Sequence, residues 1–206
     1  MTQCFHIHPV NPQRRLVQQS VEILRRDGLM VYPTDSCYAF GWHLGNREAA
    51  GRLQRIRQTG KDHNFTLVCR DLSEIATYAQ VENWCYRLLK AHTPGPYTFI
   101  LKATREVPRR LQNPKRQTIG IRVPDHPVPL SLLEVLGEPL MSSTLLLPGY
   151  DLPLSDPEEI RATRAGKIDL LIDSGSCGIE PTTVVDVTGD YPVVIRQGRG
   201  DTRGFE

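Results

Sequence analysis

A short apolar run that stops at a proline is the feature of this 206-residue chain that most constrains its fold. The run follows Gly28 and ends at Pro33, which has no N–H to give to a strand ladder and biases the preceding residue toward an extended conformation. Residues 30–32 therefore predict a buried strand. The small polar residues after it are Thr34, Asp35 and Ser36. In open α/β sheets a strand exit is the usual place for a ligand crevice, although a plain turn fits the same pattern.

The rest of the chain alternates helical and strand patterns, which predicts an α/β fold with a mixed sheet. Helices are expected over residues 11–28, 46–58, 83–92 and 127–137, with further helix starts at Asp71 and Asp156. Strands are expected over residues 5–8, 38–43, 65–69, 97–101, 118–124, 140–147, 168–172, 182–187 and 193–196. No internal repeat or low-complexity linker interrupts the pattern, so a single domain over residues 1–206 is predicted.

Composition places the chain among ordinary globular proteins, with 39% apolar and 23% charged residues. No apolar run approaches the roughly eighteen residues of a membrane span, and the first residues lack the basic and apolar regions of a signal peptide. The five cysteines are scattered without a Cys-x-x-Cys pair, which favours free thiols in a reducing compartment. A cytoplasmic enzyme or binding protein with no membrane partner is therefore expected; the sequence does not indicate an oligomeric state.

Basic residues gather in the segment 102–116, where Glu106 is the one acidic residue, although the net charge of the whole chain is only +2. The candidate RNA-binding residues of this segment are Arg105, Arg109, Arg110, Lys115 and Arg116. Clusters of this kind can follow a phosphate backbone. A solvated charged face is the alternative interpretation.

Standard catalytic motifs are absent: the sequence has no G-x-x-x-x-G-K-[ST], no G-x-G-x-x-G after a strand, no H-E-x-x-H and no G-x-S-x-G. Hydroxyl groups and cations lie at the predicted strand ends instead. Such donors hold phosphate and carboxylate oxygens. The chemistry that they indicate is electrostatic positioning of anions, as in phosphoryl or nucleotidyl transfer. A metal centre is not expected, because the pair His6 and His8 has no third ligand near it in the sequence.

Five motifs, in a consistent order along most of the chain, resemble those of the YrdC-type threonylcarbamoyl-adenylate synthases. Residues 33–41 (PTDSCYAFG) are similar to P-T-[DE]-T-x-Y-G-L-G, and residues 94–101 (PGPYTFIL) to P-G-P-x-T-x-[IV]-L. Residues 120–126 (GIRVPDH) resemble the R-x-P turn of these enzymes. Residues 182–186 (TTVVD) resemble S-T-V-V-D, and residues 195–198 (IRQG) resemble the closing [IL]-R-x-G.

Two departures from the pattern resemble the YciO branch of this family. The K-x-R of the synthases falls on Arg57-Gln58-Thr59, which keeps one cation and loses the other. Their S-x-N falls on Ser143-Thr144-Leu145, which keeps the serine and loses the asparagine. Residues 64–67 and 69–72 also resemble the YciO branch.

The resemblance implies a twisted, open, mixed sheet flanked by helices, with a basic concave face suited to double-stranded RNA or tRNA. It also implies that L-threonine, bicarbonate and ATP with Mg²⁺ give threonylcarbamoyl-AMP and diphosphate for tRNA modification, without a permanent cofactor. The residues that would bind the substrate are Thr34, Tyr38, Thr98 and Arg122. The residues that would hold the nucleotide are Arg57, Lys61, Ser143, Thr183 and Arg196, with Arg57, Ser143 and Arg196 as the catalytic group.

Three hypotheses about function remain open at this level. The first is a synthase, a nucleotidyltransferase whose activity is weakened by the changes at Thr59 and Leu145. The second is an RNA- or nucleotide-binding paralogue that lacks full synthase activity. The third is an enzyme that acts on a related acyl-adenylate or a modified nucleoside.

Overall fold

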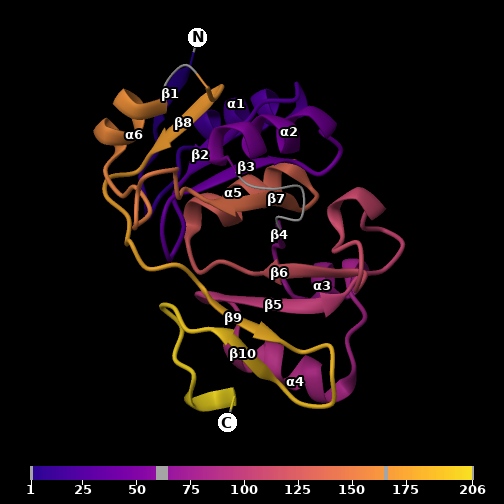
Figure 1. Ribbon diagram of the computed structural model, residues 1–206. Helices are drawn as coiled ribbons and strands as arrows, with labels where there is room; N and C mark the ends of the chain where they lie inside the picture. The colour runs from indigo at the N-terminus through magenta and orange to yellow at the C-terminus, as the bar shows by residue number, and fades with distance from the viewer. Residues whose placement is uncertain (1, 59–64, 165–166, 206) are drawn as a thin grey trace.

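The computed structural model describes residues 2–58, 65–164 and 167–205, and in these residues ten strands form one mixed sheet (Figure 1). The strands are β1 (Gln3–His6), β2 (Met30–Tyr32), β3 (Ala39–His43), β4 (Thr66–Val68), β5 (Tyr97–Lys102), β6 (Thr118–Arg122), β7 (Leu140–Thr144), β8 (Leu170–Asp173), β9 (Thr183–Asp186) and β10 (Val193–Arg196). Their order across the sheet is β1-β8-β2-β3-β7-β4-β6-β5-β9-β10. The predicted α/β class with a mixed sheet is confirmed.

The sheet brings together strands that are far apart in the sequence. β2 and β3 form an antiparallel pair around the turn that follows Pro33, and β3 then pairs with β7 in antiparallel register. β4 runs parallel to β6, and β5 runs parallel to β9. The turn after β2 therefore lies near segments that come about one hundred residues later in the chain.

Local sequence signals explain where most helices begin and end. The helices are α1 (Arg14–Arg25), α2 (Arg47–Arg57), α3 (Leu72–Tyr78), α4 (Asn83–His92), α5 (Pro127–Leu136) and α6 (Pro157–Arg164). The Asn46 side chain accepts hydrogen bonds from the N–H groups of Glu48 and Ala49 at 3.0 and 2.9 Å, as expected of an N-cap. At the other end of a helix, Gly137 has a φ of 79°, a left-handed conformation that favours glycine and stops α5.

The predicted start of the first helix at Asn11-Pro12 is wrong, because α1 begins at Arg14 with Gln13 as its N-cap. The reason lies in the preceding turn. The backbone N–H groups of Val10 and Asn11 donate to Nδ1 of His8 at 3.2 and 3.0 Å. This turn delays the helix by about half a turn.

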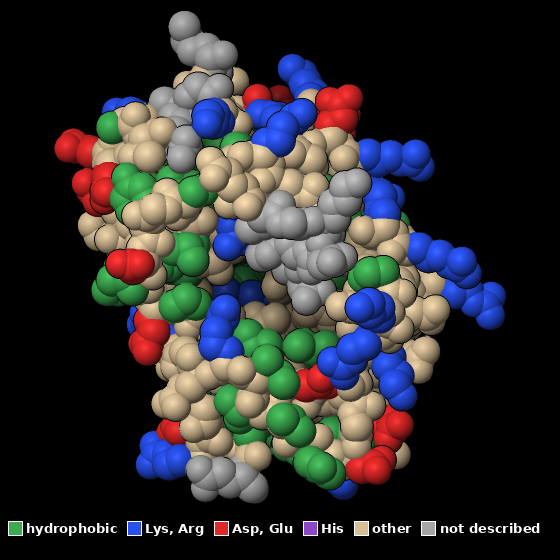
Figure 2. Space-filling model, in the orientation of Figure 1, with side chains coloured by type: hydrophobic (Ala, Val, Ile, Leu, Met, Phe, Trp, Pro, Cys, Tyr) green, Lys and Arg blue, Asp and Glu red, His purple; other side chains and the backbone are tan. Residues whose placement is uncertain are grey.

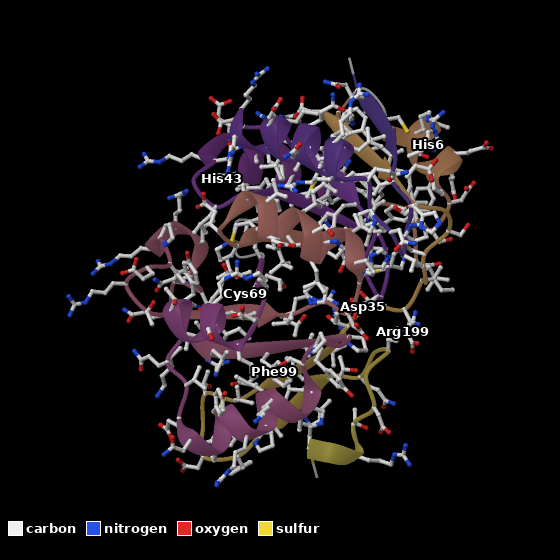
Figure 3. All side chains as sticks on the ribbon, turned by 180° about the vertical axis from the view of Figure 1, so that it is seen from behind. His6, Asp35, His43, Cys69, Phe99 and Arg199 are labelled. Atoms are coloured by element: carbon white, nitrogen blue, oxygen red, sulfur yellow. The ribbon has the colours of Figure 1, made fainter. Side chains whose placement is uncertain are left out.

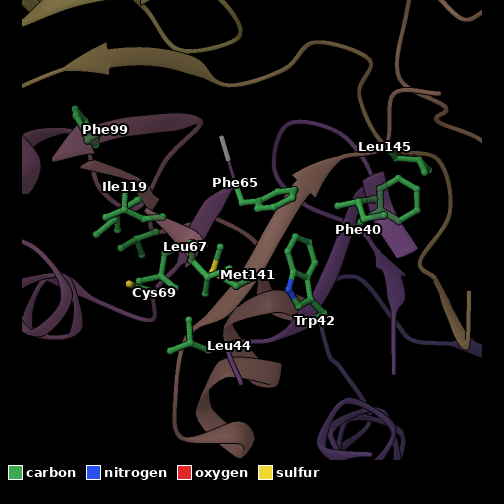
Figure 4. Close-up of a cluster of buried hydrophobic side chains, with 14 of the residues drawn as sticks. Phe40, Trp42, Leu44, Phe65, Leu67, Cys69, Phe99, Ile119, Met141 and Leu145 are labelled. Carbon is green, nitrogen blue, oxygen red and sulfur yellow. The ribbon is translucent and has the colours of Figure 1, made fainter. Parts of the chain in front are cut away.

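Two clusters of buried side chains pack the sheet. One joins α1 and α5 to β2 and β8, through residues such as Val21, Leu24 and Leu132. The other, shown in close-up in Figure 4, contains Trp42 and Phe65, whose ring centroids lie 5.1 Å apart in an edge-to-face arrangement. These contacts fix the helices and strands around the turn after β2.

None of the helices in the described residues is long and apolar enough to cross a membrane.

Candidate active site

A cavity of about 390 Å³ lies on one face of the sheet, over β5, β6 and β9. Side chains two residues apart on a strand point to the same face, and Thr98 and Ile100 of β5 line the cavity together with Gly120 of β6 and Val184 of β9. Figure 2 shows a hollow at the centre of this side of the molecule, with Lys and Arg side chains around it and apolar side chains below it. The cavity is large enough for a small-molecule ligand.

A smaller pocket of about 30 Å³ continues from this cavity toward the turn after β2. Residues that line both compartments are Thr66, Thr98, Ser143, Thr144 and Thr182. The inner pocket adds Thr34, Ser36 and Arg122. The structure therefore brings the turn after β2, the R-x-P segment and the serines of β7 to one site with two connected compartments.

Thr34 shapes the turn at the inner pocket. Its buried hydroxyl oxygen accepts from the backbone N–H groups of Ser36 and Cys37 at 3.1 and 3.2 Å, and the hydroxyl donates to the Cys37 carbonyl at 2.6 Å. This local bonding is how a threonine replaces part of a backbone turn. Thr34 thus lies at the predicted place, with its hydroxyl holding the shape of the pocket wall.

Arg122, which lines the inner pocket, forms a buried ion pair with Asp35 outside the lining, and the two side chains are 8% and 10% exposed. Arg122 also donates to the Ser36 hydroxyl at 3.3 Å. Among the described residues, neither Nε of Arg122 nor Oδ2 of Asp35 has a hydrogen-bond partner, although both atoms are buried. Buried polar groups are usually paired, so these two atoms fit a small ligand that carries both donors and acceptors.

Arg57 and Ser143, two of the predicted nucleotide-binding residues, meet at the wall of the larger compartment. Arg57 ends α2; its Nε donates to the Leu146 carbonyl at 3.1 Å, and a terminal nitrogen donates to the Ser143 hydroxyl. Burial lowers the pKa of Arg57 from the usual arginine value, but a guanidinium remains charged at neutral pH. Its fixed charge faces a cavity that can receive an anion.

Arg196 reaches the cavity from β10. Its Nη2 and Nε donate to the Thr182 carbonyl at 2.8 and 3.3 Å, and the hydroxyl of Thr182 lies 2.9 Å from that of Thr98. Burial lowers the pKa of Arg196 as well. Arg196 and Thr98 therefore line the site, and Thr182 connects them.

Two of the predicted residues have their hydroxyl groups turned to other parts of the chain. Thr183 is fully buried, donates to the Gly200 carbonyl at 2.6 Å and accepts from the N–H of Gly198 at 3.0 Å. The cavity wall is formed by Thr182 instead. Tyr38 donates to the Gly175 carbonyl at 2.7 Å, and burial raises its pKa.

All five candidate RNA-binding residues are exposed, and two of them also contact other parts of the chain. Arg116 lines the larger compartment, where its Nη2 donates to Oδ2 of Asp186 at 2.7 Å. Arg110 donates to the Leu44 and Gly45 carbonyls at 3.0 and 3.3 Å. Arg105 and Arg109 line a second cavity of about 750 Å³, which shares Asn113 with the larger compartment. Lys61 and Thr59 lie outside the described residues.

Side chains alternate between the two faces of a strand, and this alternation could have placed Arg116 and Thr182 in the lining of the site. Thr118, Gly120 and Arg122 follow Arg116 at steps of two residues and all line one of the two compartments. Thr182 and Val184 show the same step in β9. Sequence analysis assigned Arg116 to RNA binding and chose Thr183 instead of Thr182 for the nucleotide, because it did not establish which face of each strand carries the site.

The site is basic and rich in hydroxyl groups. Guanidinium groups reach the larger compartment from Arg57, Arg116 and Arg196, and no described residue that lines either compartment is Asp or Glu. Mg²⁺ prefers carboxylate, phosphate and water oxygens. A magnesium ion would therefore arrive with the phosphates of a nucleotide rather than bind to a carboxylate set of the lining.

Comparison with known proteins identifies the relatives of this chain. Residues 22–198 match the Sua5/YciO/YrdC family, described as "Telomere recombination". The chain belongs to this Sua5/YciO/YrdC family. YciO of Escherichia coli K12 is 55% identical over 205 residues, with 100% of both chains covered. The crystal structure of E. coli YciO matches with a TM-score of 0.96, and the family predicted from the motifs is confirmed.

Family members whose names state an activity or a ligand are more distant. The threonylcarbamoyl-AMP synthase of Bacillus subtilis is 26% identical over 184 residues, which cover 88% of this chain and 53% of that protein. The structure of P. abyssi Sua5 in complex with L-threonine matches with a TM-score of 0.87 and 22% identity, over 96% of this chain and 58% of that one. This second match shows a shared fold.

Proposed function

We propose that the protein is a nucleotidyltransferase that makes threonylcarbamoyl-AMP from L-threonine, bicarbonate and ATP, for the modification of tRNA adenosine. The observation that carries the proposal is the arrangement of the two compartments. A small pocket lined by Arg122, whose buried Nε has no hydrogen-bond partner among the described residues, opens into a larger cavity with three arginines. One carboxylate-sized group of the carbamate would enter the small pocket, and the rest of the carbamate and the triphosphate of the nucleotide would occupy the larger cavity.

The reaction would begin with the condensation of the threonine amine and bicarbonate, which releases water and forms a carbamate. A carbamate oxygen then attacks the α-phosphorus of ATP, and the bond from that phosphorus to the bridging oxygen breaks as diphosphate leaves. Negative charge builds up on the phosphate oxygens. Fixed cations at this place stabilise the transition state because they need no reorganisation when the charge develops.

The roles of the residues follow from the compartment that each of them lines. Arg57 with Ser143 on one wall, and Arg196 with Thr182 on another, would hold the phosphates and orient the leaving group. Arg122 would bind an anionic group of the carbamate in the inner pocket. Mg²⁺ bound to ATP would supply further neutralisation of the phosphates when it is present.

A second candidate function is an RNA- or nucleotide-binding protein without full synthase activity. The observation that favours it is Leu145, which occupies the position of the family's asparagine and is fully buried in the core. It gives the site no polar group there. Binding of double-stranded RNA or tRNA would then rest on the exposed cations, with an affinity that falls as salt rises.

The deciding experiment is to incubate the protein with labelled ATP, Mg²⁺ and bicarbonate, with and without L-threonine. Formation of AMP and diphosphate that depends on threonine supports the synthase. We expect Arg196→Ala to lower that rate by roughly a hundredfold, as for the loss of one charge-stabilising donor. Arg15→Ala is the matched control, because Arg15 is an exposed arginine of α1 that lines neither compartment. Absence of threonine-dependent products, with RNA binding retained, supports the second candidate.

A further inference from the structure

We propose that Cys4, His6 and Asp173 form a binding site for a zinc-like divalent metal ion at the β1 edge of the sheet. The sulfur of Cys4, a ring nitrogen of His6 and a carboxylate oxygen of Asp173 all lie within 4.8 Å of one another. None of these three residues lines either compartment of the proposed active site. In Figure 3, His6 is on the upper edge of the molecule, away from Asp35 and Arg199.

The strand register explains why these three side chains meet. Cys4 and His6 are two residues apart on β1, so their side chains lie on the same face of the strand. β1 pairs in parallel with β8, and His6 lies opposite Asp173 in that pairing. His8 lies beyond the end of β1, and its Nδ1 accepts hydrogen bonds from the turn at Val10 and Asn11. A metal at His6 and His8 is not expected from the sequence; the structure instead places His6 beside Cys4 and Asp173.

The distances leave room for a metal ion. Zinc binds sulfur at about 2.3 Å, nitrogen at about 2.0–2.1 Å and carboxylate oxygen at about 2.0–2.2 Å, so tetrahedral ligands lie roughly 3.3–3.7 Å apart. Nδ1 of His6 and Oδ2 of Asp173 are already 3.1 Å apart. The His6 side chain is 75% exposed, which leaves it free to rotate toward the sulfur of Cys4 and leaves a fourth position open to water.

Neighbouring groups hold two of the three ligands in place. Oδ1 of Asp173 accepts from the N–H of Gly175 at 3.0 Å, which leaves Oδ2 for the metal. The loop at Gly175 is fixed in turn by Tyr38. On the other side, Arg161 donates to the sulfur of Cys4 at 3.0 Å. Partners of this kind orient the ligands of a metal and tune its affinity.

The ligand types select the class of metal. A sulfur, an imidazole and one carboxylate suit zinc and cobalt, whereas magnesium and calcium need a larger set of oxygen ligands. A cysteine thiolate and an aspartate would together neutralise the two charges of the ion. Bound metal would join the edge strand β1 to β8 and to the loop that Tyr38 holds, so it should raise the thermal stability of the protein.

The test is titration of the full-length protein with Co²⁺, followed by the absorbance of the sulfur-to-cobalt charge-transfer band. We expect a band that saturates at one equivalent of Co²⁺, is abolished by Cys4→Ser and is displaced by Zn²⁺. His6→Gln should weaken Co²⁺ binding by roughly a hundredfold or more. Loss of a residue that merely hydrogen-bonds to a metal ligand already lowers metal affinity by roughly 10- to 100-fold, and His6 is itself a ligand in this proposal. His6→Gln changes an exposed side chain, so this variant keeps the test valid even if Cys4→Ser folds poorly.

Two control variants complete the experiment. His8→Gln alters the neighbouring histidine, and Cys177→Ser alters another partly buried cysteine; both should leave Co²⁺ binding unchanged. The proposal is overturned if Co²⁺ gives no charge-transfer band at millimolar concentration. It is also overturned if the band persists in Cys4→Ser, or if Co²⁺ binds His6→Gln as tightly as it binds the unaltered protein.

Discussion

Arg122 of the inner pocket and Asp35 form a buried ion pair, with side chains 8% and 10% exposed. Removing two charges from water is costly, and their attraction repays this cost only where further hydrogen bonds are made. Here one atom of each group has no such bond among the described residues. We therefore expect the pair to contribute to ligand binding more than to the stability of the fold. A ligand that binds only the folded protein should raise its free energy of unfolding.

Removing one partner of this pair should be strongly destabilising. We expect Arg122→Met to lower the free energy of unfolding by about 3 kcal/mol or more, because it leaves the Asp35 carboxylate buried without its cation. The double variant Asp35→Asn with Arg122→Met should recover part of the loss. Urea unfolding of the single and double variants measures both values. A double variant no more stable than Arg122→Met would contradict the account.

Thr182 and Thr183 are adjacent in the sequence but differ in what their hydroxyl groups contact. Thr182→Val should lower synthase activity on the order of tenfold or more and change stability little, since its hydroxyl faces the cavity beside Thr98 and Arg196. Thr183→Val should cost about 1–3 kcal/mol of unfolding free energy, because it leaves buried partners at Gly198 and Gly200 unpaired. Kinetics and urea unfolding of both variants test the assignment. If Thr183→Val lowered activity and Thr182→Val lowered stability, Thr183 and not Thr182 would be the residue that contacts the substrate.

At the scale of elements, proline, glycine and asparagine signals were enough to predict where β2 ends, where α2 begins and where α5 ends. These signals act through the local backbone, so a sequence shows them directly. The start of α1 depended on the His8 side chain, which binds two backbone N–H groups. The face that each strand presents to the cavity depended on pairing with distant strands, which is why Thr183 was chosen instead of Thr182 and Arg116 was assigned to RNA binding.

His126 gives α5 a pH-dependent N-cap. Its Nδ1 accepts from the N–H of Val128 at 3.1 Å, which requires this nitrogen to be unprotonated. Burial lowers the pKa of His126 below the ordinary value of 6.5, and it outweighs the opposite effect of the carboxylates of Asp35 and Asp125. The folded protein therefore takes up this proton less readily than the unfolded chain does.

The resulting prediction concerns acid stability. Unfolding free energy should fall as pH drops below about 6.5, because the unfolded state then binds more protons than the folded state. Replacement of His126 by Asn keeps a side-chain cap but removes the titration. Urea unfolding between about pH 7 and about pH 5 should show a smaller decrease for His126→Asn. Equal decreases in both proteins would show that His126 does not titrate in this way.

At the scale of the whole molecule, the sheet order explains how five short motifs make one site. The motifs lie at the turn after β2, on β5, at the end of β6, on β9 and at the end of β10, and β7 adds its serines to the same site. The sequence predicted the motifs and the α/β class. It did not predict that β8 inserts between β1 and β2, because that pairing depends on tertiary contacts and no local pattern encodes it.

Positive charge is divided between the cavity and the outer surface, and this division can be tested. All three of Arg105, Arg109 and Arg116 are exposed, but Arg105 and Arg109 line a second cavity whereas Arg116 lines the candidate site. We expect Arg105→Gln with Arg109→Gln to weaken binding of duplex RNA and leave nucleotide binding unchanged. Arg116→Gln should weaken nucleotide binding instead.

Fluorescence anisotropy of labelled duplex RNA over a range of salt concentrations measures the first effect. The slope of log affinity against log salt should become less steep by up to about 1.8, since each phosphate contact contributes about 0.9. The matched control is Arg14→Gln with Arg15→Gln, which removes two exposed arginines of α1. If both double variants bind RNA with the slope of the unaltered protein, the segment of Arg105 and Arg109 is a solvated face and not an RNA contact.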